Sequence, residues 1–75
     1  MQELVEFIVD NITGKKSEVE LIKEESRSVI LIKVPQEKIG QVVGKRGQVI
    51  KAIRILVGIK AANENLPGYW RVEVQ

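Results

Sequence analysis

The 75-residue sequence predicts an α+β domain with the element order α-β-β-α-α-β, a three-stranded mixed sheet and the helices packed on one face. Two patterns carry this prediction. Apolar residues recur at helical spacing near the N-terminus and again after Gly47, whereas "EVELIKE", "SVILIKV" and "YWRVEV" have the alternating or β-branched composition of strands. The length adds a third observation, because a chain of this size forms one domain, spanning 1–75, with a small core.

Residues 2–13 are predicted to form the first helix. Four apolar residues recur there at helical spacing: Leu4, Val5, Ile8 and Ile12. Gly14 follows them and suits the C-terminus of a helix.

Three strands are predicted, over 18–24, 28–34 and 69–74. The short segment "ESR" between the first two predicts a hairpin, and the almost wholly apolar second strand is expected at the centre of the sheet. A helical crossover joins the second strand to the third, so these two are expected to be parallel neighbours. Alternation in the last strand points three side chains inward: Trp70, Val72 and Val74.

Two further helices are predicted between the second and third strands. Pro35 ends the strand and suits the start of a short helix over 36–43, which Gly44 interrupts. A longer helix begins near Gly47 and runs to about residue 62, where the breaker-rich loop "NENLPG" ends it.

Positive charge is concentrated in one segment, although the net charge is only +2. Residues 1–37 hold five basic and eight acidic side chains, and residues 64–75 hold one basic and two acidic ones. Residues 38–63 hold six basic side chains and no acidic one. Such a patch attracts polyanions, although the alternative is a solvated helix face. No aromatic residue lies in or near this segment of the sequence, so base stacking is not expected to dominate.

The glycine-rich stretch "GQVVGKRGQVIKAI" lies inside the basic segment. It is not a P-loop, because three residues rather than four separate Gly40 from Gly44, and Arg46 stands where a magnesium-binding hydroxyl is required. It also lacks the first G-x-G of a dinucleotide motif. The remaining interpretation is a turn between two helices. Gly44 and Gly47 let the backbone bend sharply and approach a ligand, while Lys45 and Arg46 supply charge-assisted contacts to phosphate.

The same stretch resembles the signature of the K-homology (KH) domain, in which an aliphatic helix leads to G-x-x-G and then to an aliphatic residue. Five residues match that signature: Gly40, Val43, Gly44, Gly47 and Ile50. The element order is that of the type II KH fold of bacteria, and the whole chain is similar to the KhpA-like group of small single-domain RNA-binding proteins. Val43 replaces the commoner isoleucine, and Gln48 stands where many members carry a basic residue.

The resemblance implies a clamp for about four nucleotides of single-stranded RNA, with single-stranded DNA as an open alternative. It assigns the phosphate contacts to four residues: Gly44, Lys45, Arg46 and Gly47. Lys51 lies one helical turn further on and can reach the same backbone, whereas Gly40 is expected to allow close backbone packing. Candidate walls of the groove for the bases are Ile39, Val42, Val43, Ile50 and Ile53. Val43 and Ile50 lie nearest the turn, and core packing is the alternative for each wall.

The long helix has two apolar faces, although a helix lying on a sheet needs only one. The expected core side holds Val49, Ile50, Ile53, Leu56 and Val57. The second face holds Ala52, Ile55, Ile59 and Ala62. An exposed apolar face marks an interaction site, whereas the alternative is that "NENLPG" and the first helix cover it. The resemblance points to a homodimer and to a heteromer with a larger KhpB/Jag-like KH protein.

Two hypotheses of function follow. The first is a non-enzymatic RNA-binding protein, which the resemblance implies is an RNA chaperone or post-transcriptional regulator. The second is a dimerisation subunit that recruits a larger partner, with RNA binding secondary; the intact pair Lys45 and Arg46 favours the first. The chain has no Cys or His, and no carboxylates pair near the turn, so no catalytic residue, metal or cofactor is expected. It shows no signal peptide or membrane span and is expected in the cytoplasm.

Overall fold

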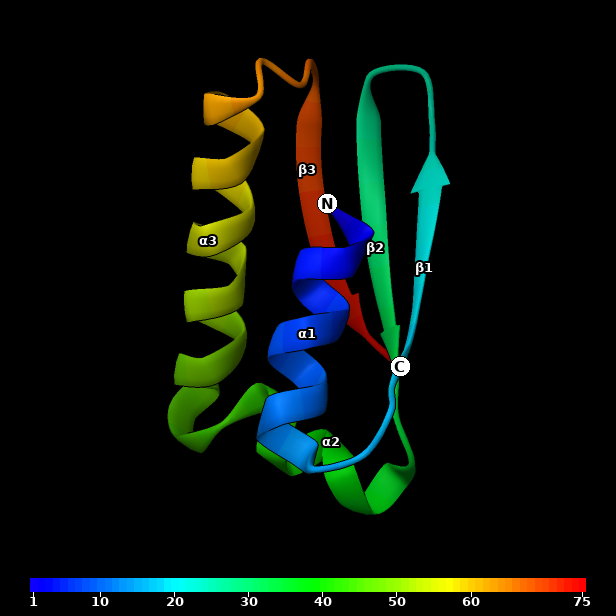
Figure 1. Ribbon diagram of the computed structural model, residues 1–75, viewed down its shortest axis with the longest axis vertical. Helices are drawn as coiled ribbons and strands as arrows, with labels where there is room; N and C mark the ends of the chain where they lie inside the picture. Colours follow the sequence, from blue (N-terminus) through cyan, green and yellow to red (C-terminus); the bar gives the residue numbers. More distant parts are fainter.

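The computed structural model describes residues 1–75 and confirms the predicted order of elements (Figure 1). The elements are α1 (Gln2–Thr13), β1 (Glu18–Lys23), β2 (Arg27–Lys33), α2 (Gln36–Val43), the single 3₁₀ turn η1 (Lys45–Gly47), α3 (Gln48–Asn63) and β3 (Tyr69–Val74). The hairpin strands begin or end one residue from their predicted limits, and the other predicted elements agree with the structure to within two residues.

The sheet has β2 at its centre and is mixed, as predicted. β1 runs antiparallel to β2, with Leu21 opposite Ile30, because a short turn joins them. β3 runs parallel to β2, with Val72 opposite Ile30, because the chain crosses over through α2 and α3. β1 and β3 are therefore edge strands, and the outer edge of β3 has no strand partner.

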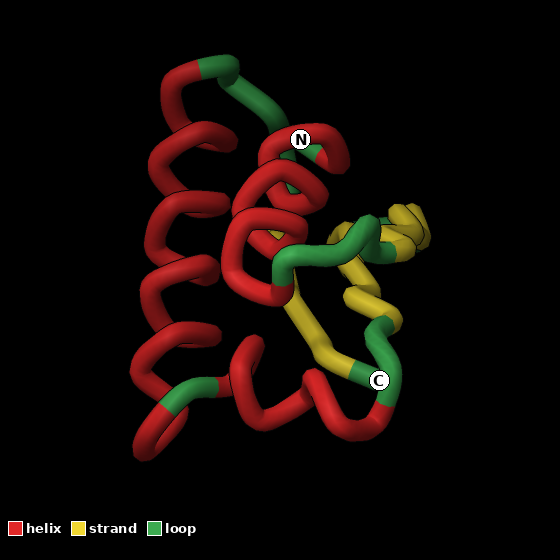
Figure 2. The backbone as a smooth tube through the Cα atoms, turned by 60° about the horizontal axis from the view of Figure 1, so that its bottom comes forward, coloured by secondary structure: helices red, strands yellow, loops and turns green.

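All three helices cover the same face of the sheet (Figure 2). Ile30 and Ile32 point into the layer between sheet and helices and are fully buried. The opposite face is open and carries charged pairs, such as Lys33 with Glu20, whose Nζ and Oε2 lie 3.1 Å apart. β2 itself is apolar on both sides, because Val29, at 8% exposure, and the half-buried Leu31 lie on its outer side, which fits its place at the centre of the sheet.

The buried face of α1 is not centred on the apolar residues that the helical spacing predicted. Val5 and Val9 are fully buried, whereas Leu4 and Ile8 are only half-buried. Val9 was absent from the predicted set. The reason is that α1 packs against the sheet, α2 and α3, so its contact is wider than a single stripe and centres one residue further along the helix.

Asp10 and Ser17 tie the end of α1 to the start of β1. The Asp10 Oδ1 atom accepts hydrogen bonds from the Ser17 backbone N at 2.6 Å and from Ser17 Oγ at 2.7 Å. These bonds favour the ionised carboxylate and hold the pKa of Asp10 below its ordinary value, with a small contribution from the charge of Lys16. Gly14 ends α1 in the left-handed conformation, as its position suggested.

Trp70 lies on the inner side of β3, as predicted, and packs half-buried against the core. Its Nε1 atom is buried without a hydrogen-bond partner. None of the helices is both long enough and apolar enough to cross a bilayer.

Candidate nucleic-acid interface

The G-x-x-G segment forms a tight turn between α2 and α3. Its backbone is left-handed at Arg46 (φ 57°, ψ 26°) and Gly47 (φ 72°, ψ 18°), and Gly44 also has a positive φ of 79°. Two hydrogen bonds fix the bend: the Gly44 amide donates to the Gly40 carbonyl at 2.8 Å, and the Gly47 amide donates to the Gly44 carbonyl at 3.1 Å. Three residues of four thus have a backbone that L side chains rarely adopt.

The three glycines are needed to different degrees. At Gly44 a Cβ atom would collide with the Val49 side chain and lie 2.8 Å from the Val49 backbone nitrogen, so only glycine fits. At Gly47 the nearest atom to a Cβ is 4.0 Å away, so the positive φ alone favours glycine. At Gly40, which is exposed in α2, a Cβ meets nothing within 4 Å. The expectation of close backbone packing at Gly40 is therefore wrong.

The turn presents free positive charge. Lys45 and Arg46 are exposed, and neither forms an ion pair, whereas Lys33 and Lys60 are each paired with a glutamate. Lys51 is also exposed and unpaired, one turn into α3. The first amide of α3, that of Gln48, donates to the Lys45 carbonyl, and the N-terminus of α3 adds the positive end of the helix dipole. The predicted clamp residues are thus brought together, with their charges available to an anion.

The predicted groove walls divide into two groups. Val42 and Ile53 are almost completely buried, at 0% and 1% exposure, so of the two interpretations core packing holds for both. Ile50 is 7% exposed and belongs mainly to the core. Val43 and Ile39 are half-buried and retain surface beside the turn. The predicted walls on the inner sides of α2 and α3 therefore belong to the core.

Sequence reasoning missed a second basic surface further along α3. Arg54 reaches from α3 to β3, where its Nε and Nη2 atoms donate to the Val72 carbonyl at 3.3 and 3.0 Å. A hollow of about 430 Å³ lies there, lined by Arg54, Tyr69, Trp70, Arg71 and Val72. Tyr69 and Trp70 are distant from the basic segment in sequence but lie beside its Arg54 in the fold. Arg54 and Val72 are eighteen residues apart, so no local pattern in the sequence signals their contact.

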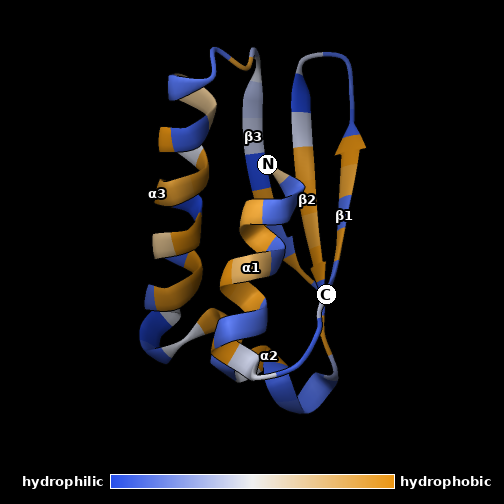
Figure 3. Ribbon diagram, viewed as in Figure 1, coloured by the Kyte–Doolittle hydropathy of each residue, from blue (hydrophilic) through white to orange (hydrophobic).

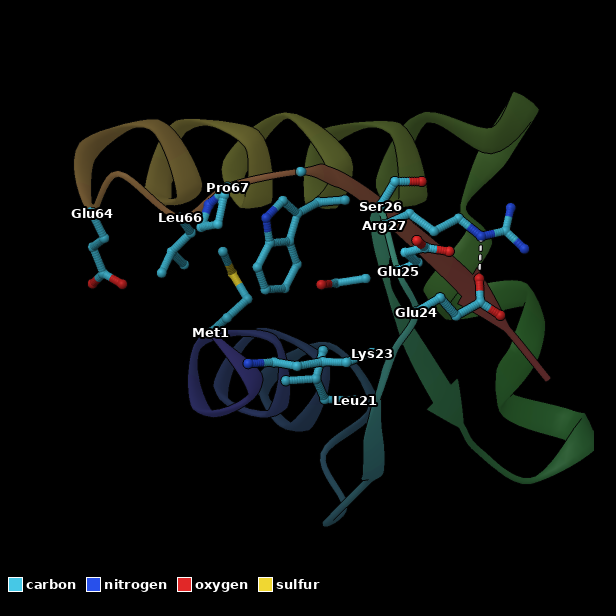
Figure 4. A pocket seen from close by; sticks show the side chains of 13 residues that line it. Met1, Leu21, Lys23, Glu24, Glu25, Ser26, Arg27, Glu64, Leu66 and Pro67 are labelled. Carbon is cyan, nitrogen blue, oxygen red and sulfur yellow. Dashed lines mark hydrogen bonds and ion pairs between the residues drawn. The ribbon is translucent and has the colours of Figure 1, made fainter.

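Another hollow lies at the opposite end of the molecule, beside the β1–β2 turn and the loop before β3 (Figure 4). Its charged lining comprises Lys23 and Arg27 together with Glu24, Glu25 and Glu64. Glu24 is ion-paired with Arg27, as the dashed line in Figure 4 shows. With more acidic than basic groups, this hollow does not attract a polyanion.

The second apolar face of α3 is exposed. Ile55 and Ile59 are 58% and 52% exposed, and Ala52 and Ala62 are exposed beside them. Leu56 was expected in the core but is 44% exposed and extends this face; Ala61 lies in the core instead. Figure 3 shows apolar residues on the outer side of α3 as well as on its inner side. Neither the loop before β3 nor α1 covers this face.

The sequence matches a known family. A family model described as "KhpA/KhpB, KH domain" matches residues 2–74. The chain belongs to the KhpA/KhpB KH-domain family. No solved structure matches the chain.

Relatives in the KhpA/KhpB family cover most of the chain. The RNA-binding protein KhpA of Borreliella burgdorferi is 40% identical over 65 residues, which is 84% of this chain and 79% of the relative. Its counterpart in Clostridium perfringens is 41% identical over 68 residues, 87% and 89% of the two chains. The counterpart in Thermotoga maritima is 41% identical over 59 residues, 76% and 79%. These relatives are named as RNA-binding proteins, and the KhpA/KhpB KH domain is a non-enzymatic module.

Proposed function

We propose that the chain binds single-stranded RNA by clamping its phosphate backbone on the turn formed by Gly44, Lys45, Arg46 and Gly47. The observation that carries the proposal is the pair of exposed, unpaired cations on a turn whose first glycine leaves no Cβ in the way. The names of the relatives support RNA as the polyanion. We further propose that the chain acts as an RNA chaperone or post-transcriptional regulator, a role that requires no catalytic group.

The clamp acts through charge and backbone shape and therefore does not select a base sequence by itself. Lys45 and Arg46 provide charge-assisted contacts to phosphate, and the positive end of the α3 dipole adds to the attraction. Lys51 extends the contact by one helical turn. Val43 and Ile39 offer apolar surface for the bases. Gly40 has no side chain and therefore leaves space beside them on the surface of α2. With two to four phosphates bound, the logarithm of the binding constant is expected to fall with the logarithm of the salt concentration with a slope of about −1.4 to −2.8.

The test is fluorescence anisotropy of a labelled randomised RNA with the wild type and with Lys45→Asp/Arg46→Asp. The two reversed charges are expected to lower affinity at least about tenfold, since each lost contact is charge-assisted. The matched control is Lys15→Asp/Lys16→Asp, because it reverses two adjacent exposed lysines outside the turn. Equal losses in both variants would mean attraction by overall charge, and unchanged binding in the clamp variant would refute the proposal. A single-stranded DNA of the same length tests the open alternative.

A second function is proposed from the exposed apolar face of α3. Ile55, Leu56 and Ile59 form a contiguous set at spacings of one, three and four, with no cover from this chain. We infer that a second copy of the chain, or a KhpB/Jag-like KH protein, covers it. A homodimer would present two clamps to one RNA and gain avidity.

Light scattering tests this second function. Ile59→Asp is expected to give monomers, because a buried unpaired charge is strongly unfavourable at an apolar interface. The control is Phe7→Asp, which changes an apolar residue that is 67% exposed on α1 and is expected to leave the dimer intact. A wild type that is monomeric at high concentration would refute the homodimer.

A further inference from the structure

The hollow beside the β1–β2 turn opens where the layer between sheet and helices is not filled. Ile30 and Ile32 of β2 fill this layer further along and are fully buried. Two residues nearer the turn, the same side of β2 presents Ser28, which is flanked by Lys23 of β1 and Trp70 of β3. The hollow has a volume of about 430 Å³, which lies within the range of small-molecule sites, about 300–1,000 Å³.

The rim of this hollow is held by backbone contacts. The Tyr69 amide donates to the Ser26 carbonyl at 3.2 Å, which joins the β1–β2 turn to the loop before β3. Gly68 allows this approach, because a Cβ atom there would lie 3.1 Å from the same carbonyl oxygen. The Leu66 amide donates to the Ala61 carbonyl at 2.9 Å and ties the loop to α3. The hollow is therefore formed by the fold itself.

Ser28 supplies the hollow with a hydrogen-bonding group that the fold does not use. Three hydroxyl side chains of the chain are buried, and those of Thr13 and Ser17 form hydrogen bonds within it. Ser28 is 8% exposed, lines the hollow and has no such partner. Trp70 Nε1 is the one buried side-chain atom that is both sealed and unpartnered, so the Ser28 hydroxyl is open to the hollow. A ligand that bonds to this hydroxyl satisfies a buried polar group.

Apolar surface surrounds the Ser28 hydroxyl. Leu21, Leu66, Met1 and Trp70 line the hollow. In Figure 4, Leu21 lies on one side of the hollow and Leu66 lies on the other. An apolar body can therefore be enclosed from both sides, as is usual for small-molecule sites with few polar groups.

The charged side chains of the lining do not favour a charged ligand. Two of its three glutamates are neutralised by ion pairs: Glu24 with Arg27, and Glu64 with Lys60. Lys23 and Glu25 remain unpaired, and their charges are opposite. The free charges around the hollow thus cancel.

From these features we propose that the hollow binds a small uncharged amphipathic molecule, whose single hydroxyl or carbonyl group hydrogen-bonds to Ser28. The serine hydroxyl can donate or accept, so it suits either group. The apolar body of the ligand, one ring or a short alkyl chain, packs against Leu21, Leu66 and Trp70. This site lies at the opposite end of the molecule from the glycine turn (Figure 1) and is separate from the RNA clamp.

The experiment titrates the ¹⁵N-labelled chain with benzyl alcohol and, as a probe without a hydroxyl, with toluene. Saturable shifts are expected at the amides of Ser28 and Leu66 and at the indole N–H of Trp70, the single tryptophan. Ser28→Ala is expected to weaken benzyl alcohol about twofold to tenfold, the net worth of one hydrogen bond, and to leave toluene unchanged. Ser17→Ala is the matched control, because this serine is equally buried and bonds to Asp10 instead.

Two further comparisons test the chemistry and the location. Benzoate and benzylamine, which are charged at neutral pH, are expected to bind more weakly than benzyl alcohol. Lys45→Asp/Arg46→Asp is expected to bind benzyl alcohol like the wild type, so this proposal and the RNA clamp can fail separately. Shifts that do not saturate, or that avoid the hollow, would show a hollow filled by water alone and overturn the proposal. Equal effects of Ser28→Ala on both neutral probes, or tighter binding of a charged probe, would also overturn it.

Discussion

Replacement of Arg46 by glycine is expected to stabilise the fold while weakening RNA binding. Arg46 has a left-handed backbone, with φ 57° and ψ 26°, in the middle of the turn. Its side chain is exposed and makes no hydrogen bond or ion pair within the chain, so the fold loses no contact with it. A residue that strains the backbone and contributes nothing to packing is expected where function requires its charge.

The expected magnitude follows from two opposing terms. A left-handed L residue costs about 1–2 kcal/mol, which glycine avoids. Glycine also gives the unfolded chain more freedom, which offsets about 0.4–1 kcal/mol of that gain. The free energy of unfolding therefore rises by about 0.5–1 kcal/mol, or about 2–8 °C in the thermal midpoint of a domain this small. Binding loses one phosphate contact, so the salt slope shrinks by about 0.7.

Lys45→Gly is the matched control, because it removes the neighbouring charge where φ is not positive. We expect the same loss of RNA affinity but a lower free energy of unfolding, since glycine there relieves no strain. Urea denaturation measures both stabilities, and anisotropy in a salt series measures both affinities. A destabilised Arg46→Gly variant, or equal stability changes at the two positions, would refute the reasoning.

Other predictions concern the glycines and Asp10. Gly44→Ala is expected to lower the free energy of unfolding by about 2 kcal/mol or more, because its Cβ meets the backbone of Val49 at a φ of 79°. Gly47→Ala, with free space around the Cβ, is expected to lose only about 1 kcal/mol, and Gly40→Ala to gain about 0.5–1 kcal/mol as a helix-interior alanine. Equal losses in urea denaturation at all three would contradict this ranking. The pKa of Asp10 is lowered in the fold, so its stabilisation is complete above the ordinary value of 3.8 and is lost as pH falls through the lower folded pKa. In a thermal pH series, stability of the wild type is expected to fall more steeply than that of Asp10→Asn below pH 3.8; parallel curves would exclude the linkage.

Local patterns in the sequence predicted the fold because they agree with its long-range contacts. The hairpin, the crossover and the glycine turn each depend on neighbouring residues, so spacing alone indicates them. The sides of α3 were harder to assign. Leu56 lies on the expected core stripe by spacing, yet the sheet covers only the arc from Ile50 through Ile53 to Val57, and Leu56 falls just outside it. How far a sheet wraps a helix is a tertiary property.

The sequence likewise predicted only part of the candidate site. Gly44, Lys45, Arg46 and Gly47 are consecutive, so the sequence displays them together. Arg54 and Tyr69 meet only because β3 returns beside α3, and no periodicity signals that approach. The expectation of close backbone packing at Gly40 was wrong because a match to the KH signature does not show how much space surrounds the residue.

The central claim is that RNA is held at the turn between α2 and α3. The most direct measurement is a titration of ¹⁵N-labelled protein with a randomised ten-nucleotide RNA, followed by amide chemical shifts. The largest shifts are expected at Gly44, Lys45, Arg46 and Gly47 and at the first amides of α3. Large shifts confined to the β1–β2 turn or the outer face of α3, with the glycine turn unchanged, would contradict the account.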